Sequence, residues 1–167
     1  MEKTIAQLEE VLHAEIAAHE RLLAAIRRKV DACRKARRDD VEAQCRLENQ
    51  ELQALAQCEK QRLQLVADLT RAIDPGARKP LRMGEMAAKL PEPARGRLTK
   101  LRDQLRASAE QVKRDSGVAR QAAEALMRHM QGIVQAIGGA ITGIVTYNRR
   151  GSRPPAAVAV STFCATA

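Results

Sequence analysis

The side chains in this 167-residue chain that are suited to catalysis are few and scattered. Its three histidines, His13, His19 and His129, fall on predicted helix faces without a serine or cysteine partner in a recognisable motif. His19 lies in an apolar stripe, where we expect a histidine that is hydrogen-bonded at the interface between two helices. Gly138 and Gly139 lie in an apolar segment with no following lysine, so they do not form a phosphate-binding loop. We therefore expect no catalytic site and no enzyme activity.

The cysteines predict neither a metal site nor a disulfide framework. They show no C-x-x-C spacing and no histidine at ligand spacing, and they are Cys33, Cys45, Cys58 and Cys164. If the chain turns near Asp39, Cys33 and Cys45 face each other across a helical hairpin. We interpret them as two small apolar residues that fill a seam, with a disulfide or a metal site as the alternative. We expect no cofactor, and a reducing cytoplasm as the compartment, because the polar N-terminus is unlike a cleavable signal peptide.

The composition favours long helices. The chain has one tyrosine, one phenylalanine and no tryptophan, while 29% of its residues are charged. Alanine, glutamate, lysine, leucine, arginine and glutamine dominate its first two thirds, as is typical of helical bundles and coiled coils.

The basic charge does not by itself indicate nucleic-acid binding. The formal net charge is +9, and its excess lies at the end of the first predicted helix and in the middle connection. Single-strand binders use stacking aromatic side chains, and the only two aromatic residues stand near the C-terminus. Most basic residues alternate with acidic ones, which is typical of a solvated helix face. We therefore expect no nucleic-acid partner.

Apolar residues recur every three or four positions along most of the chain. This spacing predicts an all-α fold, an elongated antiparallel three-helix bundle or coiled coil with a long third helix and a C-terminal tail. The predicted helical domain covers residues 1–148, and a flexible tail containing proline, arginine and glycine covers 149–167. Helices are expected at about 3–37, 40–73, 83–89 (short) and 93–146.

Three breaks separate these helices. Asp39, with Glu42 three residues later, resembles a capping box and predicts a tight turn; one unbroken helix of about 70 residues, or about 105 Å, is the alternative. Asp74-Pro75-Gly76 is a strong stop signal. The segment 90–93 breaks the chain again, with Pro93 placed to begin the next helix.

The segment from Ala125 to Tyr147 is the most apolar in the chain. No formally charged residue occurs between His129 and Asn148, and four glycines interrupt the segment. Its apolar part is shorter than the roughly 20 residues of a membrane-spanning helix, so we expect no stable membrane insertion. We predict a partner-binding face made of Leu126, Met127, Met130, Ile133, Val134, Ile137, Ile141, Ile144, Val145 and Tyr147.

The order of these features resembles the FlgN family of flagellar type III export chaperones. The resemblance covers about residues 3–151, and three places carry it: the turn at 38–43, the segment 90–93 with the leucines that follow it, and the apolar helix that closes on 146–151. It implies a small cytoplasmic bacterial protein that binds the hook–filament junction proteins FlgK and FlgL and delivers them to the export apparatus. It also implies that the C-terminal helix grips the cargo.

Two other functions remain open from the residues alone. The apolar stripe is also suited to pairing with a second copy of the chain in a structural coiled coil or homo-oligomer. A basic helical module that binds nucleic acid or an anionic membrane surface is the third hypothesis.

Overall fold

The computed structural model describes residues 1–141, with side chains for residues 1–138. Within that part the chain forms four helices and no strand, which confirms the predicted all-α class. The helices are α1 (Glu2–Arg34), α2 (Arg38–Ile73), α3 (Met83–Ala88) and α4 (Ala94–Ile141). The predicted end of the last helix at 146 and the predicted tail lie outside the described residues. The chain divides into two compact units, residues 1–127 and residues 128–167.

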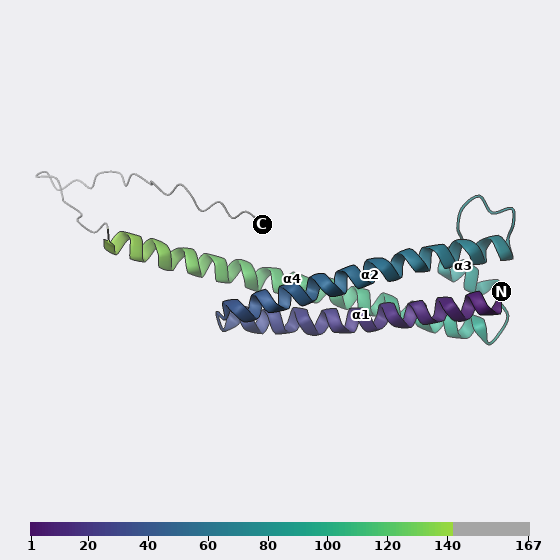
Figure 1. The fold of residues 1–167 in the computed structure, drawn as a ribbon, viewed down its shortest axis with the longest axis horizontal. Coiled ribbons are helices and arrows are strands. Elements are labelled where there is room, and N and C mark those ends of the chain that lie inside the picture. Colours follow the sequence, from purple (N-terminus) through teal and green to yellow (C-terminus); the bar gives the residue numbers. More distant parts are fainter. Residues whose placement is uncertain (142–167) are drawn as a thin grey trace, which may run out of the picture. The chain divides into compact units, whose positions relative to one another are not determined.

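Helices α1 and α2 form an antiparallel hairpin (Figure 1). The side chains that join them show the direction, because residue numbers on α2 fall as those on α1 rise. The ion pairs are Arg62 Nε to Glu15 Oε2 at 3.1 Å, Arg21 Nε to Glu51 Oε1 at 2.9 Å, and Lys29 to Glu48. The predicted hairpin is therefore formed, and the single unbroken helix is excluded.

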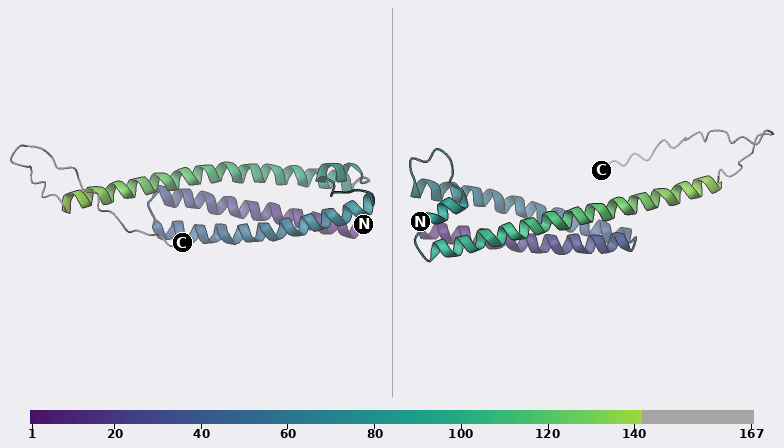
Figure 2. Two further views of the ribbon diagram at one scale, coloured as in Figure 1. Left: turned by 90° about the horizontal axis from the view of Figure 1, so that it is seen from above. Right: turned by 180° about the vertical axis from the view of Figure 1, so that it is seen from behind.

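Within the first unit, α4 runs parallel to α1 and lies beside it (Figure 2). Contacts between the two helices advance together along both. They are Arg97 Nε to Glu9 Oε1 at 2.8 Å, His19 Nδ1 to Ser108 Oγ at 2.8 Å, and Arg27 Nε to Asp115 Oδ2 at 2.9 Å. The first unit is thus an up-down-up arrangement in which α1 contacts both other long helices.

The main hydrophobic core lies where the beginning of α1, the end of α2, α3 and the beginning of α4 meet. Its largest fully buried side chains are Leu8, Leu12, Leu69, Met86 and Leu98. A smaller cluster further along α1 comprises Leu22, Ile26, Val30 and Ala119. Helix α3 covers the end of the bundle, because Met86 and Ala87 are both buried in the main core.

The connection from α2 to α3 is fixed by Thr70. Its buried hydroxyl donates to the Val66 carbonyl at 2.7 Å and accepts from the Leu81 N–H at 3.0 Å. The helix ends at Ile73, as the stop signal predicted. Lys89 Nζ pairs with Asp74 Oδ2 at 3.0 Å and lowers the pKa of that carboxyl, so the residue after α2 is also joined electrostatically to the residue after α3.

The turn between α1 and α2 is real, but the predicted cap residue is wrong. The N-cap of α2 is Arg37, and Asp39 and Asp40 lie in the first helical turn. There they complement the positive end of the helix dipole without capping it. The turn is set instead by the C-terminus of α1, where Ala36 has a left-handed φ of 50°. The Arg37 N–H donates to the Ala32 carbonyl at 3.0 Å and the Ala36 N–H to the Cys33 carbonyl at 3.1 Å, which is a Schellman motif.

Ala36→Gly is expected to stabilise the protein by about 0.5–1 kcal/mol. A left-handed conformation disfavours a residue with a Cβ, and glycine adopts it without that penalty. Urea denaturation measures the change. The matched control is Ala24→Gly on the exposed face of α1, which should cost about 1 kcal/mol because it lies in a helix interior. A loss of stability in both variants would contradict this account of the turn.

Candidate protein-binding face

The predicted binding residues lie on α4, the longest helix described. Helix α4 has 48 residues, against 33 in α1 and 36 in α2. Leu126, Met130, Ile133 and Ile137 are spaced by four, three and four positions, so they share one face of the helix. Met127 and Val134 are their neighbours on that face.

These apolar side chains are exposed. Leu126 is half-buried. The remaining described members and their exposed fractions are Met127 62%, Met130 51%, Ile133 41%, Val134 65% and Ile137 54%. Ile141 is the last residue described in α4, and its side chain is not; Ile144, Val145 and Tyr147 lie outside the described residues. The described part of the face is therefore an apolar strip in contact with water, and contiguous strips of this kind mark interaction surfaces.

The helix backbone under this face is weakened by glycine. Gly132 lies within α4, and a Cβ added there would meet nothing within 4 Å. Close packing in the structure therefore does not require a glycine at this position. Each such residue lowers helix stability by about 1 kcal/mol relative to alanine, so this segment gains more than most from packing against another protein.

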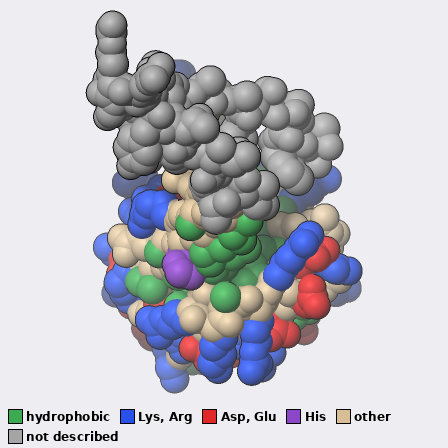
Figure 3. Space-filling model, turned by 90° about the vertical axis from the view of Figure 1, so that its left-hand side faces the viewer, with side chains coloured by type: hydrophobic (Ala, Val, Ile, Leu, Met, Phe, Trp, Pro, Cys, Tyr) green, Lys and Arg blue, Asp and Glu red, His purple; other side chains and the backbone are tan. Residues whose placement is uncertain are grey.

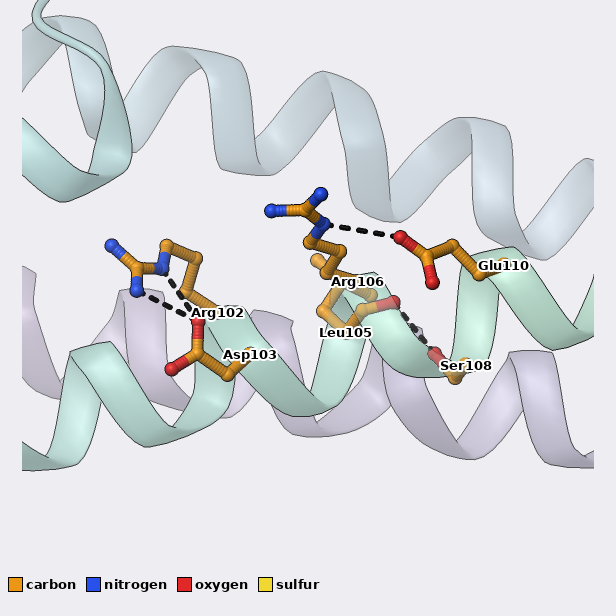
Figure 4. Close-up of polar contacts among 6 residues, drawn as sticks. All are labelled: Arg102, Asp103, Leu105, Arg106, Ser108 and Glu110. Atoms are coloured by element: carbon orange, nitrogen blue, oxygen red, sulfur yellow. Dashed lines mark hydrogen bonds and ion pairs between the residues drawn. The ribbon is translucent and has the colours of Figure 1, made fainter.

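The polar character of α4 changes along its length. Its first half carries ion pairs within the helix, of which Arg102 Nη2 to Asp103 Oδ1 at 2.7 Å and Arg106 Nε to Glu110 Oε1 at 3.1 Å are drawn in Figure 4. No charged residue follows Arg128 in the described part of the helix. A partner can thus cover the part of the strip from Met130 onward without desolvating a formal charge.

The bundle itself contains a polar layer between its two apolar clusters. His19 is half-buried and bonded to Ser108, which confirms the histidine predicted at the interface between two helices; burial lowers its pKa. Nearby Glu15 is buried, and burial raises the pKa of its carboxyl more than the attraction of Arg62 lowers it. Sequence reasoning missed Glu15, although it stands three residues after Leu12, at a position where the apolar spacing requires a buried side chain.

The cysteines are free thiols in the described part of the chain. Cys33 is buried, and burial raises the pKa of its thiol; Cys45 and Cys58 are partly exposed. No group of histidine, cysteine and acidic side chains that could hold a metal ion occurs among residues 1–141. Cys164 lies outside the described residues. Cys33 thus fills the seam as a small apolar residue.

Over residues 1–141, no helix combines the length and the apolar character that crossing a membrane demands.

An all-α bundle that exposes an apolar strip on its last helix has an arrangement typical of proteins that bind other proteins. Comparison with protein families gives a match to the FlgN protein family over residues 1–155. The chain therefore belongs to the FlgN family of flagellar export chaperones, which is not a family of enzymes. Searches of curated proteins and of solved structures give no match.

Proposed function

We propose that this chain binds hook–filament junction proteins of the FlgK and FlgL type in the cytoplasm and delivers them to the flagellar type III export apparatus. The observation that carries the proposal is the strip of exposed apolar side chains on α4, in a chain of the FlgN family. An amphipathic helix with anchors every three or four residues can pair with a helix of the cargo.

The described part of the strip supplies enough apolar surface for useful affinity. Burying one leucine, isoleucine or methionine side chain contributes roughly 1.5–3 kcal/mol before ordering costs. The five partly exposed anchors, Met127, Met130, Ile133, Val134 and Ile137, thus contribute gross apolar burial of the same order as the about 8 kcal/mol net that micromolar binding requires. The flexible thioethers of Met127 and Met130 allow the same strip to accommodate related cargo helices.

The proposal extends to Ile141 and to the part of the chain that follows it. Ile141, Ile144, Val145 and Tyr147 continue the apolar spacing in the sequence and would lengthen the cargo-binding face. Residues 149–167 would then form a tail outside the helical domain of residues 1–148.

The test is a calorimetric titration of the purified chain with a purified FlgK- or FlgL-type protein. A saturable complex with a dissociation constant in the micromolar range or below is expected. If heat is absent and the chain instead sediments as a concentration-dependent dimer, the strip serves self-association and the chaperone proposal is wrong.

A further inference from the structure

A groove in the first unit, separate from the apolar strip, lies between the last turns of α1 and the middle of α4. Its volume is about 470 Å³, and its apolar surface comes from Ile26 and Val30 on α1 and Val118 on α4. Ile26 and Val30 are buried at its base, whereas Val118 is 49% exposed. Of the three, Val118 therefore offers most of the apolar surface that a side chain of another molecule can contact.

The walls of this groove carry basic charge that the chain itself does not neutralise. Its two acidic residues are already paired: Asp115 with Arg27 at 2.9 Å, and Asp31 with Lys35 at 3.6 Å. Arg28 and Arg34 also line the groove. Neither appears in an ion pair or a side-chain hydrogen bond within the described part of the chain.

The surroundings of the groove are basic as well. Residues 27–38 contain seven lysines and arginines and one acidic residue, Asp31. Four of the seven are ion-paired within the unit, and Arg28, Arg34 and Arg38 are in no ion pair among the described residues. On the face drawn in Figure 3, lysine and arginine side chains lie around the edge, with acidic side chains among them. The electrostatic potential at this end of the unit therefore attracts an acidic partner and raises its rate of association.

We propose that this groove docks an acidic amphipathic segment of a partner protein, with an aliphatic side chain on Ile26, Val30 and Val118 and carboxylates on Arg28 and Arg34. The apolar lining favours a protein segment over a nucleic acid. The groove offers no aromatic side chain on which a base can stack. Arginine pairs with carboxylates through two parallel hydrogen bonds, so the interaction is directional as well as electrostatic.

This docking site is independent of the cargo proposal, because the residues that line it include none of the apolar strip on α4. A chaperone that holds cargo on one surface can thus contact a second, acidic protein through another. The two surfaces are separable by variants that alter one and leave the other intact.

The experiment uses the full chain and a fluorescein-labelled 21-residue peptide with leucines spaced by three and four positions and glutamates beside them. Fluorescence anisotropy at 100 mM NaCl measures its affinity. Arg28→Glu/Arg34→Glu is expected to weaken binding at least tenfold, and Val118→Asp at least fivefold. Arg95→Glu/Lys100→Glu, which changes the net charge equally at two exposed residues elsewhere on α4, should change it less than twofold. Circular dichroism confirms that each variant is folded.

Four results would overturn the proposal. The peptide does not bind the unaltered chain, or both double variants weaken it equally, which indicates diffuse charge attraction. Val118→Asp has no effect, which removes the apolar lining from the interaction. A single-stranded 20-nucleotide DNA competes with the peptide for Arg28 and Arg34, which assigns the groove to nucleic acid. The affinity of Arg28→Glu/Arg34→Glu for a FlgK- or FlgL-type protein should equal that of the unaltered chain.

Discussion

Ile137→Asp is expected to weaken binding of a FlgK- or FlgL-type protein at least a hundredfold, with little change in the stability of the free chain. Ile137 is 54% exposed, so the free protein loses little packing when it is replaced. In the proposed complex the same side chain is covered by cargo. The variant then loses roughly 1.5–3 kcal/mol of apolar burial and must also desolvate a carboxylate, and a hundredfold change corresponds to about 2.8 kcal/mol.

The matched control for this variant is Gln135→Asp. It adds the same charge two residues away on the same helix, and Gln135 is also exposed, but residues two apart face opposite sides of a helix. Calorimetric titration should show cargo affinity within threefold of the unaltered chain for Gln135→Asp. Equal losses in both variants would mean that charge, and not the apolar strip, governs binding. A large drop in the free energy of unfolding for Ile137→Asp would make the strip part of a core.

Leu98→Ala is expected to lower the free energy of unfolding by about 2–5 kcal/mol. Leu98 is 0% exposed and lies in the cluster to which all four helices contribute. Its replacement by alanine removes the favourable free energy of burying the lost carbon atoms and leaves a cavity that the surrounding helices fill only in part. Because domains of this kind are stable by only about 5–15 kcal/mol, the loss is a large share of the total. Urea denaturation monitored by circular dichroism measures it.

Leu63→Ala provides the comparison, because Leu63 is a leucine on α2 that is 57% exposed. It should cost no more than about 0.5 kcal/mol, as exposed substitutions usually do. A similar cost for both leucines would show that the main core is not where the structure places it. Since neither side chain belongs to the apolar strip, both variants should bind cargo normally while they remain folded.

The helices were predictable because their apolar spacing is regular and their breaks are strong. The stop after Ile73 and the short helix that begins at Met83 follow directly from local residues. The turn between α1 and α2 was placed two residues late. A cap signal at Asp39 was visible in the sequence, whereas the left-handed alanine at position 36 that makes the turn was not.

Tertiary contacts explain what the sequence could not show. The ion pair of Glu15 with Arg62 joins residues 47 positions apart, and the docking groove combines residues of α1 and α4 that no local pattern connects. The apolar strip, by contrast, was visible as a run of spaced apolar residues without charge. Its side chains from Met127 to Ile137 are exposed in the structure, and their role in binding cargo stays a prediction.

Amide hydrogen exchange, measured with and without a FlgK- or FlgL-type protein, tests the role of this strip most directly. In the free chain the glycine-containing end of α4 should exchange quickly, because its helix is weak and its apolar face is uncovered. Cargo should slow exchange in peptides that cover residues 126–147 and leave the main core around Leu98 unchanged. Unchanged exchange at 126–147, with protection only in the α1–α2 hairpin, would contradict the assignment of the cargo-binding face.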